Sequence, residues 1–222
     1  MEVIKTDIDG VLVIEPRVFE DSRGYFFESF SQREFDEKVA PIRFVQDNES
    51  KSSYGVMRGL HFQRPPFSQS KLVRCVQGAV LDVVVDIRKG SPTYGQHVSC
   101  LLCGHDEEGA RIAQQFGNSI TDNRLPITVN NSLTANRLPI TGKIGLQFFI
   151  PKGFSHGFAV LSESAIFQYK CDEFYHPEAD AGINILDASL GIDWLIPTDK
   201  VILSEKDTKH PLLQDFVTPF TY

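Results

Sequence analysis

His61 is the residue whose type best suits proton transfer near neutral pH. An unperturbed imidazole has a pKa of about 6.5 and can act as a general base there. Arg58 lies three residues earlier, and on an ideal strand the two side chains would point to opposite faces. A bulge or bend at Gly59 would turn both toward one pocket. A packed or surface histidine is the alternative interpretation.

Lys71 could supply a fixed positive charge. It precedes a short apolar run and, on a strand, shares a face with Val73 and Cys75. If that face is interior, an enclosed ammonium is costly unless it has a chemical purpose. A solvated lysine at the start of a strand is the alternative.

Three further side chains could complete an acid–base site. His156 lies at a glycine-flanked corner, and Tyr169 would share a strand face with Phe167 and Cys171. Histidine and tyrosine are also common as hydrogen-bonded core residues. Asp207 could orient an imidazole, as a carboxylate does in many base constellations.

The spacing of potential metal ligands argues against a metal centre. The histidines are scattered, at positions 61, 97, 105, 156, 176 and 210, and no His-x-His pair occurs. Cys100 and Cys103 form a lone C-x-x-C, and on a strand their thiols would point to opposite faces. We therefore expect no metal site.

Composition bounds the class of protein. The 222 residues carry a net charge of −7, which argues against a nucleic-acid-binding surface but allows a small phosphate pocket. No apolar run approaches the length of about 18 residues that a membrane span needs. The first residues have no apolar signal core, and four cysteines are too few for a disulfide framework. We expect a cytoplasmic protein that binds neither nucleic acid nor membrane.

Short strands separated by turns dominate the expected secondary structure. Residues 11–14, 25–30, 147–151, 158–161 and 165–171 are strand-like, and residues 72–76 and 79–87 suggest a hairpin around Gln77–Gly78. One short helix is expected from residue 31, with Ser31 as its cap. This pattern predicts an all-β sandwich or jelly roll, because no helices alternate with the strands.

Residues 101–145 do not follow this pattern of short strands and turns. They are polar, and residues 123–128 recur as residues 136–141. Two copies are too few for a solenoid. We expect an inserted, solvent-exposed loop or hairpin at about 103–143 within a single domain spanning 1–222.

An ordered set of segments resembles one family. The segments are residues 21–28, 45–48, 58–63, 71–75, 82–89, 150–158 and 204–207. Together they are similar to the dTDP-4-dehydrorhamnose 3,5-epimerase family over nearly the whole chain except about 103–143. The resemblance implies a cupin-like jelly roll (double-stranded β-helix) with a few short helices. It also implies a homodimer with strand exchange that uses neither metal nor organic cofactor.

The resemblance also implies a reaction and roles for residues. The substrate would be dTDP-4-dehydro-6-deoxy-D-glucose, inverted at C3 and C5 to dTDP-4-dehydro-L-rhamnose in dTDP-L-rhamnose biosynthesis. His61 would be the base, Asp207 its orienting carboxylate, Lys71 the cation at the enolate oxygen and Tyr169 the acid. In the family, the positions of Phe26 and Glu28 belong to substrate-binding residues of the partner subunit. All positions that match substrate-binding residues are Arg23, Phe26, Glu28, Gln46, Asp47, Asn48, Arg58, His156, Asp180 and Lys206.

Three other functions stay open at this point. A mono-epimerase that inverts only C3 or C5 would use the same base and acid. A 3,4-ketoisomerase of the same cupin class fits residues 58–63 and 71–75 less well. A non-catalytic nucleotide-sugar-binding protein would need no acid and base on opposite sides of the sugar.

Overall fold

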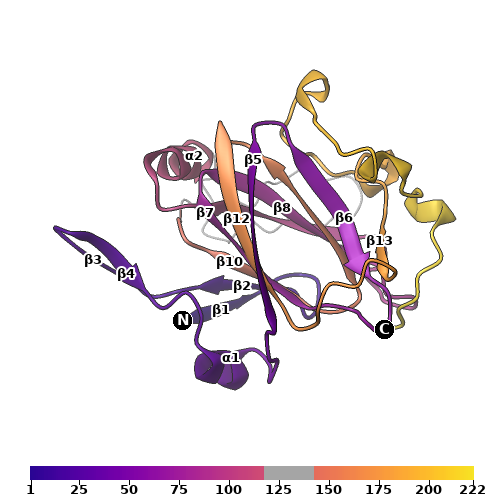
Figure 1. Cartoon of the computed structure of the whole chain (residues 1–222), viewed down its shortest axis with the longest axis horizontal. Helices are drawn as coiled ribbons and strands as arrows, with labels where there is room; N and C mark the ends of the chain where they lie inside the picture. The colour runs from indigo at the N-terminus through magenta and orange to yellow at the C-terminus, as the bar shows by residue number, and fades with distance from the viewer. Residues whose placement is uncertain (118–142) are drawn as a thin grey trace.

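The computed structural model describes residues 1–117 and 143–222, and two antiparallel sheets dominate it (Figure 1). One sheet has six strands, in the order β1 (Glu2–Lys5), β2 (Leu12–Glu15), β10 (Gln147–Ile150), β7 (Lys71–Gln77), β12 (Ser164–Cys171) and β5 (Gln46–Ser53). The other has five, in the order β13 (Asp180–Gly182), β6 (Met57–Gln63), β11 (Phe154–Val160), β8 (Ala79–Asp86) and β9 (His97–Cys103). The all-β prediction is confirmed.

The core lies between the two sheets. Alternate side chains of β7 and β12, among them Val73 and Phe167, meet those of β8 and β11, among them Val84 and Phe158. Each of these four is at most 5% exposed, as the period-2 alternation of strands requires. The same alternation directs the intervening side chains of these strands to the outer faces of the sheets.

Short helices and the C-terminal segment cover the outer faces. Helix α1 (Gln32–Lys38) buries Phe35 against Leu72 and Phe149 of the six-stranded sheet. Residues 183–220 cover the five-stranded sheet with Ile183, Leu190 and Trp194. That segment contains the 3-10 turns Ala188–Leu190, Thr198–Lys200, Asp207–Lys209 and Leu213–Asp215. The expected helix after Ser31 is confirmed, although the Ser31 side chain makes no capping hydrogen bond.

A two-stranded hairpin of β3 (Val18–Asp21) and β4 (Gly24–Phe27) projects away from the sandwich (Figure 1). Its aromatic side chains are unusually exposed, with Phe26 at 70% and Phe19 and Tyr25 each at 50%. Exposed apolar groups concentrated on one projecting element are typical of an interaction surface.

The expected hairpin of residues 72–87 is wrong. Strands β7 and β8 belong to different sheets, so the chain crosses between sheets at Gln77–Gly78. Gly78 has φ of +75°, and a Cβ there would lie 2.1 Å from the Ser164 carbonyl oxygen. The glycine therefore marks a tight corner, which local sequence does not distinguish from a hairpin turn.

The first part of the expected 103–143 loop is a helix. Helix α2 (Glu107–Gly117) buries Ile112 and Ala113 against Leu101 and Cys103. Phe116, one helical turn after Ile112 and Ala113, packs against the same cluster, so one face of the helix is apolar. The repeated segments 123–128 and 136–141 lie outside the described residues. In the described part of the chain, no helix has both the length and the apolar character to cross a membrane.

Candidate active site

A cavity opens between the two sheets at one end of the sandwich. It has two adjoining parts, of about 480 Å³ and 400 Å³. Four side chains line both parts: His61, Lys71, Tyr169 and Lys206. The site is thus built from β6 on one sheet, β7 and β12 on the other, and the C-terminal segment.

A bulge in β6 turns Arg58 and His61 into the same cavity. The pairing of β11 with β6 shifts register between His156 and Phe158, because two β6 residues, Gly59 and Leu60, oppose one residue of β11 there. Gly59 supplies the extra residue, with φ of +137° and a position where a Cβ would lie 2.5 Å from the Gly157 Cα. The expected bend at Gly59 is confirmed.

Asp207 holds the His61 ring. The carboxylate, 3% exposed, accepts a hydrogen bond from His61 Nε2 at 2.6 Å. Burial raises the pKa of Asp207, but hydrogen bonds from His61 and Ser204 outweigh it and keep that pKa below the usual value. Because the ionised carboxylate can only accept, Nε2 carries the proton. Nδ1 of the neutral ring then keeps a lone pair for proton abstraction.

Lys71 and Tyr169 face His61 from the other sheet. Both lie on the inner face of their strands, in line with the core residues Val73 and Phe167. Among residues 1–117 and 143–222, Lys71 Nζ has no hydrogen-bond or ion-pair partner, and burial lowers the pKa of Lys71. Burial raises the pKa of Tyr169, so its phenol is protonated at neutral pH. A free cation and a phenol thus stand across the cavity from an imidazole.

A second imidazole–carboxylate pair closes the inner end of the cavity. His156 Nε2 donates to Asp82 at 2.9 Å, and both side chains are buried, at 7% and 0% exposure. Burial lowers the pKa of His156, so the ring is neutral at pH 7. Burial raises the pKa of Asp82, and the ionised Asp82 carboxylate favours the protonated form of Lys71.

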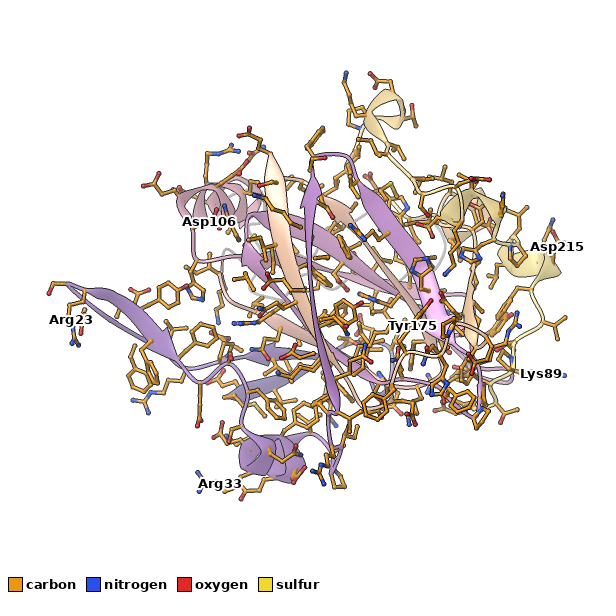
Figure 2. The ribbon with its side chains drawn as sticks, in the orientation of Figure 1. Arg23, Arg33, Lys89, Asp106, Tyr175 and Asp215 are labelled. Carbon is orange, nitrogen blue, oxygen red and sulfur yellow. The ribbon has the colours of Figure 1, made fainter. Side chains whose placement is uncertain are left out.

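The outer part of the cavity is polar. Gln46 and Asn48 of β5 line it together with Asp180, which pairs with Lys206. Tyr175 donates to Asp180 Oδ2 at 3.0 Å, and Figure 2 shows Tyr175 beside β6. These amides and charges suit the polar end of a ligand whose reacting end lies near His61.

Comparison with known proteins places this site in a family. The family model for dTDP-4-dehydrorhamnose 3,5-epimerase matches residues 5–124 and 132–215. The chain belongs to this family. The Escherichia coli dTDP-4-dehydrorhamnose 3,5-epimerase is 43% identical over 218 residues, which cover 98% of this chain and 97% of that protein.

Solved structures agree with this assignment. An epimerase from Legionella pneumophila in complex with dTDP-4-keto-L-rhamnose is 40% identical, with a TM-score of 0.76 over 97% of this chain and 94% of that one. A 3'-monoepimerase from Streptomyces bikiniensis in complex with dTDP-quinovose is 27% identical, with a TM-score of 0.72 over 95% and 87%. The expected cupin-like jelly roll of the epimerases is thereby confirmed.

Four residues that the epimerase resemblance suggested do not line this cavity in the single chain. Asp47 points to the opposite face of β5 from Gln46 and Asn48, and it forms an ion pair with Lys170 at 2.5 Å. Arg23, Phe26 and Glu28 belong to the β3–β4 hairpin and the residue after it. Figure 2 shows Arg23 at the far tip of this hairpin. The remaining members of the suggested set line one or both parts of the cavity.

Sequence reasoning missed Tyr175, which lines the cavity, and two residues next to it, Asp82 and His210. Asp82 had a usable signal, because it is a lone acid in the otherwise apolar run of β8 up to Val85. Tyr175 and His210 lie in irregular segments, where no periodicity predicts direction. Ligand atoms of His61, Asp207 and His210 lie within 4.8 Å of one another. This is a metal-compatible cluster that the scattered histidine positions did not suggest.

Lys71→Met should stabilise the fold while removing the cation. Burial lowers the pKa of Lys71, so the lysine binds its proton more tightly in the unfolded chain than in the folded one. The wild-type free energy of unfolding therefore rises with pH until the pH reaches 10.5, the ordinary pKa of lysine. We expect the free energy of unfolding of Lys71→Met to exceed that of wild type by about 1 kcal/mol at pH 7, and the difference to shrink as the pH approaches 10.5. Urea unfolding at several pH values measures this difference. Arg33→Met, on exposed α1, is the control. A loss of stability at pH 7 in Lys71→Met would contradict this.

Proposed function

We propose that the chain inverts C3 and C5 of dTDP-4-dehydro-6-deoxy-D-glucose and forms dTDP-4-dehydro-L-rhamnose, a step of dTDP-L-rhamnose biosynthesis. One observation carries the proposal. The imidazole of His61, oriented by Asp207 at 2.6 Å, faces Lys71 and Tyr169 across a single cavity. Family membership supports the substrate class. The reaction only moves protons, so it needs no redox cofactor.

The first half of each inversion is proton abstraction. The C4 ketone acidifies the C–H bonds at C3 and C5, and His61 Nδ1 takes one proton as the C–H electron pair forms an enolate. Asp207 stabilises the imidazolium that results. Negative charge builds on the C4 oxygen, where Lys71 provides a preorganised cation. One good donor of this kind contributes roughly 3–4 kcal/mol to transition-state stabilisation.

The second half is protonation from the other face of the ring. Tyr169 donates its phenolic proton to the enolate carbon, and the C4 ketone re-forms with inverted configuration at that carbon. The tyrosinate recovers a proton from solvent, and His61 releases its proton there. Base and acid come from different sheets, so the bound pyranose lies between them. That arrangement makes inversion, rather than return of the same proton, the outcome.

The nucleotide end needs cations and hydrogen-bond donors. Arg58 lies at the cavity and donates from Nε to Ser52 Oγ at 3.2 Å, and within the described residues its terminal nitrogens have no hydrogen-bond partner and could bind phosphate. A guanidinium suits bidentate phosphate binding. Lys206, Gln46 and Asn48 supply further polar groups. An acidic chain can therefore bind a dianionic ligand, because the electrostatic potential inside the pocket, rather than the net charge of the protein, determines the attraction.

His61→Ala should abolish the base while leaving nucleotide binding intact. We expect kcat to fall by about 10²–10⁴-fold or more, with dTDP affinity within about twofold of wild type. Conversion of the keto-sugar followed by NMR, and calorimetric titration with dTDP, measure the two effects. His176→Ala is the matched control, because the His176 side chain is also 30% exposed but lies outside the base pair. Near-normal turnover of His61→Ala would remove His61 from the mechanism.

Tyr169→Phe should uncouple exchange from inversion. The variant keeps His61 and Lys71, so the base still removes protons from C3 and C5, but the phenolic proton donor on the other face of the ring is gone. In deuterium oxide we expect label at C3 or C5 of recovered substrate, with product formation reduced about 10²-fold or more. Tyr222→Phe, at an exposed tyrosine, is the control. Inversion at the wild-type rate would show that another group is the acid.

We also propose a homodimer that exchanges the β3–β4 hairpin, and a cytoplasmic location. The hairpin projects from its own sandwich and exposes Phe26, so Arg23, Phe26 and Glu28 could complete the cavity of a second copy. Exchange of an element between identical copies is a low-cost route to dimers. All four cysteines are free, buried thiols, which agrees with a reducing compartment.

Mixing two damaged chains tests hairpin exchange. His61→Ala loses the base, and Phe26→Ala loses a hairpin contact. Refolded as an equal mixture, half the dimers are mixed, and each mixed dimer holds one intact site, so about a quarter of wild-type activity should return. Activity no higher than the mean of the separate variants, or a monomeric mass of 25.0 kDa in sedimentation, would contradict exchange.

A mono-epimerase is the second candidate, because the Streptomyces 3'-monoepimerase shares this fold. The higher identity to the 3,5-epimerases favours double inversion. Deuterium at both C3 and C5 of the product supports double inversion. Label at only one carbon supports the mono-epimerase.

A further inference from the structure

The His210 ring lies beside the base pair. Within the described residues its Nε2 is buried without a hydrogen-bond partner, and it lies 3.9 Å from Asp207 Oδ1. Its ring centroid is 5.6 Å from that of His61, and the two rings meet edge to face at 72°. One carboxylate thus lies between two imidazoles that are 149 positions apart in the sequence.

The backbone makes room for this second ring. Gly182 of β13 pairs with His61 of β6, and a Cβ at Gly182 would lie 2.7 Å from His210 Nε2. Pro211 follows directly after His210, and the preceding turn Asp207–Lys209 fixes its approach. The ring therefore occupies a space that only a glycine at 182 leaves open.

We propose that His61, Asp207 and His210 form a binding site for a divalent transition-metal ion such as Zn²⁺, and that the bound ion switches the enzyme off. Two imidazoles and one carboxylate are typical ligands for such ions. Ligand atoms at about 2.0–2.2 Å from Zn²⁺ are roughly 3.3 Å apart in a tetrahedron. The present separations from Asp207 Oδ1, 2.6 Å to His61 and 3.9 Å to His210, lie on either side of that value.

The site is accessible from the cavity, and the lysine beside it pairs with another carboxylate. The His61 side chain is 30% exposed toward the cavity, which provides an entry path and an open fourth position for water. The nearby ammonium of Lys206 is paired with Asp180. Asp207 therefore faces two imidazole rings rather than a competing ammonium.

Occupation of the site blocks the base directly. The ion binds the lone pair of His61 Nε2, and the single ring proton, which Nε2 now donates to Asp207, moves by way of solvent to Nδ1. The metal-bound imidazole stays neutral with its proton on Nδ1, which is the atom that must be free of a proton to accept hydrogen from the sugar. This inhibitory effect rests on the proposed function. Metal binding itself does not.

Titration of the purified protein with Co²⁺ and Zn²⁺, without substrate, tests the site. We expect one Co²⁺ per chain with visible absorption of a four- or five-coordinate ion, displaced by Zn²⁺. His210→Ala and His210→Gln should weaken Co²⁺ affinity by at least tenfold, since loss of even an outer-shell partner costs about 10–100-fold. His176→Ala, at a histidine that pairs with Glu178, should bind Co²⁺ as wild type does.

Turnover is the second measurement. Zn²⁺ at one equivalent should inhibit wild-type epimerisation, EDTA should restore it, and His210→Ala should resist the same Zn²⁺ concentration. Absence of stoichiometric Co²⁺ absorption, or equal Co²⁺ affinity in wild type and both His210 variants, would overturn the metal site. A protein that binds Co²⁺ as expected but does not turn over the keto-sugar would keep the metal site and refute the proposed function.

Discussion

Inversion of a carbon centre requires a base and an acid on opposite faces of one ring, and the sandwich meets this requirement with two facing sheets. The five-stranded sheet carries His61, and the six-stranded sheet carries Lys71 and Tyr169. The same inner faces that pack Val73 and Phe167 deeper in the core end in these polar groups. The core packing therefore fixes the distance across which acid and base act.

The His61–Asp207 hydrogen bond connects this sheet geometry to the C-terminal segment. The two residues are 146 positions apart, and Asp207 is placed only because residues 183–220 cover the outer face of the five-stranded sheet with Ile183, Leu190 and Trp194. Loss of that covering would expose the apolar outer face of the five-stranded sheet and, at the same time, free the Asp207 carboxylate from its position beside His61. The packing that stabilises the fold thus also positions the base. Lys71 is the exception, because enclosing its charge lowers the stability of the fold but provides a cation at the site.

Strand alternation made part of the site predictable. It placed Tyr169 beside Phe167 and Lys71 beside Val73, and the parity conflict between Arg58 and His61 located the bulge at Gly59. Local pattern could not predict the corner at Gly78, because a hairpin and a change of sheet use the same turn residues. The position of His210 beside His61 depends on tertiary packing against Gly182. The amphipathic helix α2 is only about three turns long, and its few apolar residues stand within a polar segment of the sequence.

A crystal structure of the protein with dTDP-L-rhamnose, which lacks the reactive ketone, tests the central claim most directly. The account predicts the pyranose between the two sheets, with His61 Nδ1 and Tyr169 Oη each within about 4 Å of C3 or C5, on opposite faces of the ring. A sugar bound with both side chains on the same face, or in a different cavity from His61, would contradict it.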